Sequence, residues 1–286
     1  MSKQNLLVFG FCVAFMIIAF WDIAAFIDNS RRGFLLFATN VLPVLFPFFF
    51  ISSLLIELNI FRNNKGAKFG VVVMSFLSGY PTGARMLSDL YTRGQITRTQ
   101  AIKTATYTST TSPIFVIATV GVALYGDVKL GVLIFMAHVM GALLNGLLYT
   151  KCRFTNHPVT AAPCHPSKEG NLSDVVSQAL HTSVQSILGV GGLIVMFLIA
   201  AAPFGLIGSA LLEMTTAIFH ASNMSTGGMW RAVIPCAIVS FGGLCVAVQG
   251  FVFMRAFDLP VWFYFLYKTT HTLLAVGCCA VLVLLF

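Results

Sequence analysis

Apolar segments long enough to cross a bilayer recur through almost the whole chain, over residues 6–286. A membrane-spanning helix needs about 20 apolar residues, and a soluble domain cannot hide so many such segments in one core. Composition agrees, because 58% of the 286 residues are hydrophobic and only 9% are charged. The length accommodates about eight to ten hydrophobic segments. The sequence therefore predicts an all-α polytopic membrane protein and excludes a soluble enzyme.

The 17 Lys and Arg residues give a formal charge of +8, but they are scattered between the apolar segments. Nucleic-acid-binding proteins gather such charge in a patch or stripe, so we expect no nucleic-acid partner. In a membrane protein, positive loops indicate the cytoplasmic side. The seven cysteines lie mostly within apolar segments and predict no disulfide framework. The expected partners are the lipid bilayer of the cell membrane and a small-molecule substrate, and a homo-oligomer is left open.

The hydropathy pattern divides the chain into two membrane halves, residues 1–150 and 175–286, joined by a polar, proline-containing linker at residues 151–174. A linker of this composition and length is expected on the cytoplasmic side. The segments expected in the two halves are 6–27, 34–56, 69–91, 101–125 and 130–149, followed by 188–212, 232–257 and 262–286.

Residues 78–84 interrupt the segment 69–91 with glycine and proline, so a helix should stop there and restart. The loops on either side, 61–68 and 92–103, each carry three positive residues. If both loops are cytoplasmic, the segment is a re-entrant hairpin whose tip reaches the membrane midplane. The alternative is a single helix kinked at Pro81.

The same loop-charge pattern places both chain termini in the cytoplasm and makes the segment 232–257, broken at 240–243, a second hairpin from the opposite face. An internal repeat supports this pairing, since Gly79 and Gly242 are each followed 17 residues later by an aliphatic residue, Ile96 or Leu259. A lysine and hydroxyl residues then follow in both halves. Inverted repeats with discontinuous helices bind substrate near the midplane, between the repeats.

The candidate substrate site consists of residues at or near the breaks. A restarted half-helix directs N–H groups and its positive dipole end at a ligand, and hydroxyl and amide groups add directional hydrogen bonds. Its members are Gly79, Tyr80, Pro81, Thr82, Gly83, Arg85, Ser109, Thr110, Ser112, Gly242, Gly243 and Gln249. Arg85 either meets a ligand or pairs with Asp89, one helical turn away.

Ionisable residues within membrane segments are functional candidates because burying them is costly. The ion-coupling candidates are Asp89, Glu213, Lys268 and His271. Two of them have a second interpretation. Glu213 is also consistent with an interfacial helix end, and Lys268 lies close enough to a segment start to extend its ammonium toward the interface.

Other chemistry is not indicated. Cys152, His157, Cys164 and His165 lie in or near the linker, but their spacing matches no zinc pattern. The sequence contains neither an HExxH nor a GxSxG motif. We therefore expect no metal, no cofactor and no enzymatic activity.

Several motifs together resemble the YlbJ family of sporulation integral membrane proteins, within the nucleoside-recognition (Gate) domain group. They lie in the right order along most of the chain, at residues 42–48, 79–85, 109–113, 213–215 and 241–249, with His271 near the end. The resemblance implies an inverted-repeat fold similar to concentrative nucleoside transporters, with two hairpins meeting at a central site.

The sequence thus predicts a transporter or permease that works by alternating access on a small polar or anionic metabolite, with a nucleoside-like compound as one option. The alternative is a non-transporting scaffold or assembly protein of the sporulation type. The two differ in the region around the breaks. A transporter needs a polar-lined cavity there, whereas a scaffold should fill it with Leu and Phe.

Overall fold

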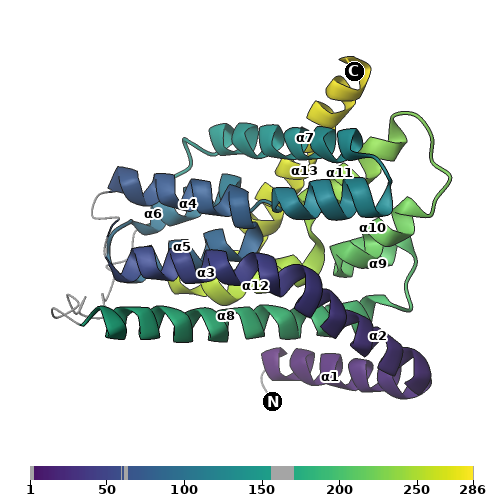
Figure 1. Cartoon of the computed structure of the whole chain (residues 1–286), viewed down its shortest axis with the longest axis horizontal. Helices are drawn as coiled ribbons and strands as arrows, with labels where there is room; N and C mark the ends of the chain where they lie inside the picture. The colour runs from purple at the N-terminus through teal and green to yellow at the C-terminus, as the bar shows by residue number, and fades with distance from the viewer. Residues whose placement is uncertain (1–2, 59, 61–63, 156–170, 286) are drawn as a thin grey trace.

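The computed structural model describes residues 3–58, 60, 64–155 and 171–285, and these residues form helices and no strand (Figure 1). The first half contains α1 (Lys3–Trp21), α2 (Ile23–Leu36), the π-helical turn η1 (Phe37–Val41), α3 (Leu42–Glu57), α4 (Asn64–Ser78), α5 (Tyr80–Thr92), α6 (Arg98–Thr108), the π-helical η2 (Ile114–Leu124) and α7 (Val128–Leu148). The second half contains α8 (Leu172–Ala201), α9 (Leu206–Leu212), α10 (Met214–Ser222), α11 (Trp230–Phe241), α12 (Gly243–Met254), the short η3 (Arg255–Phe257) and α13 (Val261–Leu285).

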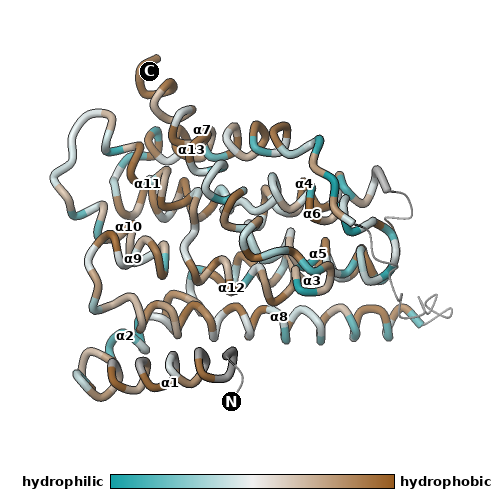
Figure 2. The backbone as a smooth tube through the Cα atoms, turned by 180° about the vertical axis from the view of Figure 1, so that it is seen from behind, coloured by the Kyte–Doolittle hydropathy of each residue, from teal (hydrophilic) through white to brown (hydrophobic). Residues whose placement is uncertain are grey.

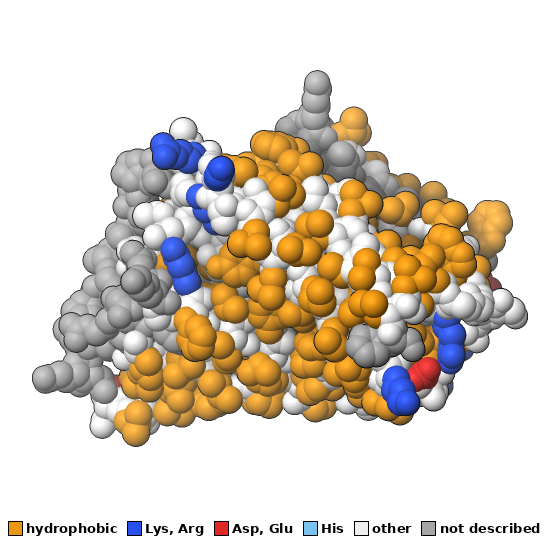
Figure 3. All heavy atoms as spheres, turned by 90° about the horizontal axis from the view of Figure 1, so that it is seen from above, with side chains coloured by type: hydrophobic (Ala, Val, Ile, Leu, Met, Phe, Trp, Pro, Cys, Tyr) orange, Lys and Arg blue, Asp and Glu red, His pale blue; other side chains and the backbone are white. Residues whose placement is uncertain are grey.

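Within the described residues, five helical stretches are long and apolar enough to cross a membrane: Ile23–Glu57, Val128–Leu148, Leu172–Ala201, Trp230–Phe257 and Val261–Leu285. Apolar residues predominate along the helices in Figure 2, and many large ones are exposed. On the face seen in Figure 3, Lys and Arg lie toward the two ends of the molecule, with an apolar belt between them. Because such a belt is unfavourable in water, it is the lipid-contacting surface of a polytopic membrane protein.

The two ends of the molecule can be identified from contacts. We call the end that contains Arg98, Lys103 and Arg255 the basic end. There the Arg98 guanidinium donates hydrogen bonds to the carbonyls of Thr155, Phe257 and Asp258 at 2.9, 3.0 and 2.7 Å. At the opposite end, Arg231 donates to the Tyr125 carbonyl at 3.0 Å. Figure 1 shows these as its left and right ends, and the helices run between them.

The boundaries of the first two segments differ from those expected from the sequence, 6–27 and 34–56. α1 ends at Trp21, and the Asp22 carboxylate accepts a hydrogen bond from the Ala25 N–H at 2.9 Å, which starts α2. α2, η1 and α3 then form one continuous helix across the polar stretch at residues 28–33, where we expected a loop. Arg32 and Asp28 pair at 2.8 Å on its surface, which lets the helix continue.

The break at Gly79 folds the chain back on itself. Gly79 has a φ of 95°, which only glycine adopts readily, and separates α4 from α5. Ser75 and Gly83, each four residues from Gly79, lie so close that a Cβ on Gly83 would be 2.1 Å from the Ser75 Oγ. The two arms therefore pack against each other, and both outer ends lie at the basic end. A kinked continuous helix is excluded.

The second break does not form a hairpin, and here the sequence prediction is wrong. Gly242 (φ 82°) and Gly243 (φ 74°) do separate α11 from α12. However, α11 packs on α13, α7 and α10, whereas α12 packs on α5, α8 and α9. In Figure 1 the pair runs from the end containing Arg231 to the basic end, as one interrupted crossing.

The hairpin of the second half is instead formed by α9 and α10, which pack side by side (Figure 1). Their connection is Glu213 alone, in an extended conformation with φ −147° and ψ 120°. The segment α6–η2 is the interrupted crossing of the first half, with its break at residues 109–113. Gly79 therefore lies at a hairpin tip and Gly242 within an interrupted crossing. The predicted alignment of the two halves, which matched Gly79 with Gly242, is incorrect.

Because the second hairpin is α9–α10 and not residues 232–257, the last span, α13, runs in the direction opposite to the predicted one. α13 begins beside the basic end, where Phe263 stacks edge-on against Tyr149. It ends beside the start of α7, because Leu282 lies with Val128 and Val132 around one surface pocket. The carboxyl-terminal end of α13 and the basic loops thus lie at opposite ends of the molecule, not on one face. Of the predicted linker at residues 151–174, the structure describes residues 151–155 and 171–174.

Candidate functional site

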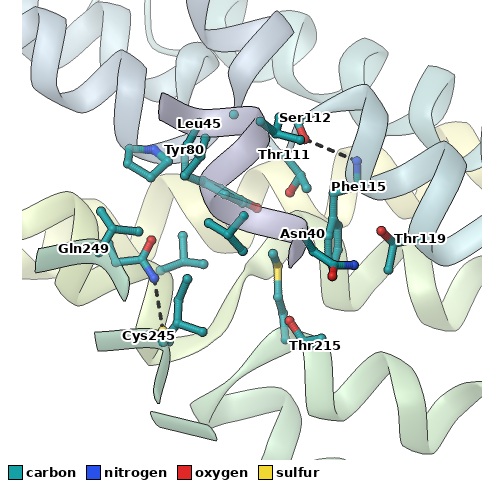
Figure 4. A pocket seen from close by; sticks show the side chains of 18 of the residues that line it. Asn40, Leu45, Tyr80, Thr111, Ser112, Phe115, Thr119, Thr215, Cys245 and Gln249 are labelled. Carbon is teal, nitrogen blue, oxygen red and sulfur yellow. Dashed lines mark hydrogen bonds between the residues drawn. The ribbon is translucent and has the colours of Figure 1, made fainter. Parts of the chain in front are cut away.

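Both hairpin tips and both interrupted crossings contribute to one cavity of about 110 Å³ (Figure 4). The tip of the first hairpin supplies Gly79, Tyr80 and Pro81, and the tip of the second supplies Glu213, Met214 and Thr215. The break after α6 supplies Thr111 and Ser112. The first two turns of α12, which follow the break at Gly242, supply Cys245, Val246 and Gln249, and η1 with α3 and α8 completes the wall. Four interruptions that are far apart in the sequence are therefore adjacent in space.

The lining of the cavity is mixed. Polar groups come from Asn40, Tyr80, Thr111, Ser112, Thr119, Glu213, Thr215 and Gln249, and several are labelled in Figure 4. Aliphatic side chains and Phe115 make up most of the remainder. Within the described lining, Glu213 is the one ionisable carboxylate, and no Lys or Arg is present. A few directional polar groups on an apolar wall are typical of a small-molecule site.

The first helical turn of α5 lies at the cavity without a side-chain cap. Gly79 is its N-cap residue and supplies no side chain, and Pro81 follows within the first turn. Gly79 packs closely on the neighbouring break, since a Cβ there would lie 3.0 Å from the Ser112 backbone nitrogen. The positive end of the helix dipole therefore lies beside the cavity and favours a hydrogen-bond acceptor or a negative charge.

Glu213 has a defined structural role at the other tip. Its carboxylate accepts hydrogen bonds from the Thr215 and Thr216 N–H groups at 2.9 and 2.7 Å and from the Thr216 hydroxyl at 3.0 Å. The side chain is buried and caps the start of α10. This carboxylate stabilises the break, and its negative charge faces a helix N-terminus.

Gln249, a substrate-site candidate from the sequence, lies in the cavity wall. Its Nε2 donates a hydrogen bond to the Cys245 sulfur at 3.1 Å (Figure 4), and that thiol lies 3.8 Å from the Leu193 carbonyl oxygen. The pair connects α12 to α8. The amide oxygen of Gln249 is the group that can accept from a ligand.

Arg85 does not line the cavity. Its guanidinium donates to the Phe49 carbonyl at 3.3 Å and to the Ser53 hydroxyl, lies 5.2 Å from the Phe49 ring centre, and is 3.8 Å from Asp89. The side chain is buried by these contacts with α3. Of the two sequence interpretations, the structure therefore places Arg85 and Asp89 in a structural pair.

The other predicted glycine and hydroxyl residues pack around the breaks, outside the cavity lining. They are Thr82, Gly83, Ser109, Thr110, Gly242 and Gly243. Thr110 donates to the Ser75 carbonyl at 3.4 Å, and Gly243 lies against the last carbonyls of α9. These residues shape the breaks and do not face a ligand in this structure.

Two buried residues of α13 lie behind the first tip. The Lys268 Nζ is 3.2 Å from the Ser109 carbonyl oxygen and 3.4 Å from the Tyr80 hydroxyl. His271 donates from Nε2 to the His138 carbonyl at 3.1 Å. Neither residue lines the cavity. Because Lys268 is fully buried, its ammonium does not reach the interface.

Sequence reasoning missed His138. Its Nε2 accepts a hydrogen bond from the Thr111 N–H at 3.0 Å, so Nδ1 carries the proton and donates to Ser240 Oγ at 2.9 Å. The imidazole thereby connects the break in α6–η2 to the end of α11. A single histidine in an apolar segment has no spacing signal, and the polar turn 109–113 gives no indication of its partner.

Among the described residues, no three metal-ligating side chains gather at one place. The linker candidates His157, Cys164 and His165 lie outside the described residues.

Comparison with known proteins gives one informative similarity. No protein-family model and no solved structure matches this sequence. The chain is similar to the sporulation integral membrane protein YlbJ of Bacillus subtilis (strain 168), with 27% identity over 201 residues, which cover 59% of this chain and 49% of that protein. The chain thus spans about half the length of the curated relative it matches. Together with the apolar helices, this similarity supports an integral membrane location.

Proposed function

We propose that this protein is a membrane transporter that moves a small polar or anionic metabolite by alternating access around the central cavity. The observation that carries the proposal is the convergence of four helix interruptions on one partly polar cavity. Irregular backbone at membrane depth is tolerated where it is covered by protein or lines a polar cavity. Four such interruptions are costly for a protein that only needs to pack.

The order of elements supports an inverted repeat, although in a different register from the one expected from sequence. The sequence of features α3, hairpin α4–α5, interrupted α6–η2 and α7 is matched by α8, hairpin α9–α10, interrupted α11–α12 and α13. The matching long helices pack on each other, α7 with α13 and α3 with α8. In such repeats, rocking of one half against the other exposes a central site to each side in turn.

The cavity supports a substrate class. A volume of about 110 Å³ suits a small solute or one part of a larger one. The uncapped first turn of α5 favours a carbonyl or carboxylate oxygen, and the Gln249 amide and the hydroxyls of Ser112 and Thr215 can orient the rest.

The basic end is assigned to the cytoplasm by the positive-inside rule. Arg93, Lys103, Arg153 and Arg255 lie there, and Arg255 does so because α12 ends at this face. The hairpin α4–α5 then enters from the cytoplasm and α9–α10 from outside.

A second candidate function is favoured by one observation, the similarity to a protein named for sporulation. In that case the protein is a membrane assembly component, and the cavity has no solute to carry.

The test is uptake by purified protein in liposomes, using a panel of radiolabelled nucleosides, nucleobases, monocarboxylates and dicarboxylates. The transporter proposal expects at least one solute to enter above the level in empty liposomes. Gln249→Ala and Ser112→Ala should reduce that uptake about tenfold or more, because each removes a hydrogen bond at the site. The matched controls Gln178→Ala and Ser173→Ala, on the exposed start of α8, should leave it unchanged. Absence of uptake for the whole panel would favour the assembly role. Full uptake by Gln249→Ala would overturn the assignment of the site.

A further inference from the structure

Lys268 is a buried amine with an unusual set of partners. The whole residue is 0% exposed, and its Nζ contacts the Ser109 carbonyl oxygen and the Tyr80 hydroxyl at 3.2 and 3.4 Å. The same nitrogen lies 4.6 Å from the centre of the Tyr80 ring. These groups belong to the broken crossing α6–η2 and to the tip of the hairpin α4–α5.

No carboxylate of the described residues forms an ion pair with Lys268. The ion pairs among the described residues involve Arg32, Arg85, Arg93 and Arg231 instead. An ammonium taken out of water without a negative partner is costly to bury. Here a carbonyl oxygen, a phenol oxygen and an aromatic face partly replace that partner, and all three attract the charged form more strongly than the neutral amine.

The contacts of Lys268 continue through Tyr80 to α11. Tyr80 donates its own hydroxyl hydrogen to the Val239 carbonyl near the end of α11, so its oxygen can only accept from Lys268. The amine thus connects α13 to the first hairpin tip and to the break after α6, and Tyr80 connects that tip to α11. Tyr80 also lines the cavity.

We propose that Lys268 is a proton-operated tie that holds the tip of the first hairpin closed when it carries a proton and releases the tip when it loses it. In the charged state, three N–H donors and the charge hold the Ser109 carbonyl and Tyr80 together. When the proton passes to water, the neutral amine keeps two donors and loses the charge-assisted attraction. This inference deepens the proposed function and rests on it in one respect, because it makes the proton the coupling ion of transport.

Other titratable groups face the same region and must be separated from Lys268. They are Tyr80 on α5, His138 on α7, and Tyr264, Tyr267 and His271 on α13; the break at Ser109 contributes none. The two imidazoles are the competitors at mildly acidic pH, because histidine normally titrates there.

Hydrogen–deuterium exchange tests the tie without any substrate. The protection of backbone amides in residues 79–87, corrected for the intrinsic effect of pH on exchange, is measured from about pH 5 to about pH 10. The wild-type protein should lose protection about tenfold as pH rises, since a charge-assisted hydrogen bond is lost. Residues 172–186 of α8 serve as the internal control and should show no such change.

Variants identify the titrating group. Lys268→Met, which keeps an unbranched side chain without the amine, should show low protection of residues 79–87 at every pH. Lys103→Met, at the basic end, should behave like the wild type, and so should His271→Asn and His138→Asn. Protection that is independent of pH in the wild-type protein would overturn the proposal. Loss of the pH response in either histidine variant, with its retention in Lys268→Met, would do the same.

Coupling is then tested in liposomes with whichever panel solute the wild-type protein transports. An imposed pH gradient should drive its accumulation, a sodium gradient should not, and Lys268→Met should exchange the solute without responding to the pH gradient. If the tip is pH-sensitive but the protein transports nothing, the role of Lys268 at the tip is supported and the transporter function is overturned. Transport that ignores the pH gradient would leave the function standing and overturn the coupling.

Discussion

At the scale of single residues, contacts in the structure separate side chains that support the breaks from side chains that can meet a ligand. Arg85 is the clearest case, because its partners on α3 and its neighbour Asp89 account for its charge. The sequence could show that an arginine near a break needs a partner. It could not show which partner, because Phe49 and Ser53 become neighbours only when α3 packs on α5.

Arg85→Ala should therefore lower the free energy of unfolding by about 3 kcal/mol, because it leaves buried partners unsatisfied. The measurement is reversible unfolding of the detergent-solubilised protein. Arg32→Ala is the control, since its pair with Asp28 is exposed and should contribute less than about 1 kcal/mol. Equal effects of the two substitutions would contradict a structural role for Arg85.

Thr82 offers the opposite prediction. Its hydroxyl is buried and, within the described structure, has no hydrogen-bond partner. Thr82→Val should stabilise the protein by about 1 kcal/mol, because it removes an unsatisfied polar group at nearly constant volume. Thr108→Val should destabilise it in the same assay, since the Thr108 hydroxyl donates to the Thr104 carbonyl at 2.8 Å. Destabilisation by Thr82→Val would indicate that its hydroxyl has a partner.

At the scale of elements, the breaks at Gly79 and Gly242 were predictable, because glycine and proline leave a local signature. What happens to the chain after a break was not, since the direction of α12 depends on its packing against α5 and α8. The hairpin α9–α10 was missed because its break contains neither glycine nor proline. The Glu213 side chain forms this break by capping α10. The hydroxyl residues Thr215 and Thr216 after it were the sequence feature that could have indicated the cap.

The packing of α7 on α13 can be tested at a glycine. A Cβ at Gly141 would lie 2.6 Å from the backbone of Ala275, whereas a Cβ at Gly277 would meet nothing within 4 Å. Gly141→Ala should lower the free energy of unfolding by about 1–3 kcal/mol through overpacking. Gly277→Ala, on the neighbouring helix, should be neutral or slightly stabilising. Similar behaviour of the two variants would show that these helices are not in close contact.

At the scale of the whole molecule, a membrane protein with several apolar helices was predictable from composition and segment length. The orientation of its last span depends on which segment is the hairpin. Loop charge alone could not decide this, because the loop at residues 223–229 carries no Lys or Arg and Arg255 directly follows α12.

The topology makes a direct prediction for single cysteines in a chain without native thiols. Thr97→Cys, at the basic end, should react with an impermeant thiol reagent only from the cytoplasmic side. Ser225→Cys and a cysteine added after Phe286 should react only from the outside. Reaction of the added cysteine from the same side as Thr97→Cys would restore the second hairpin at residues 232–257.

The central claim is that the four breaks enclose a site that water-soluble molecules reach. The most direct measurement is the reaction of a small, charged thiol reagent with Cys245 when it is the only native cysteine, and with Ser112→Cys in a chain without native cysteines. Both residues line the cavity, so both should be modified, and a transported solute should slow the reaction. Ile134→Cys, buried in the apolar core between α7 and its neighbours, should stay protected. If the two cavity positions are protected to the same extent as Ile134→Cys, water-soluble molecules do not reach the breaks and the transporter account is wrong.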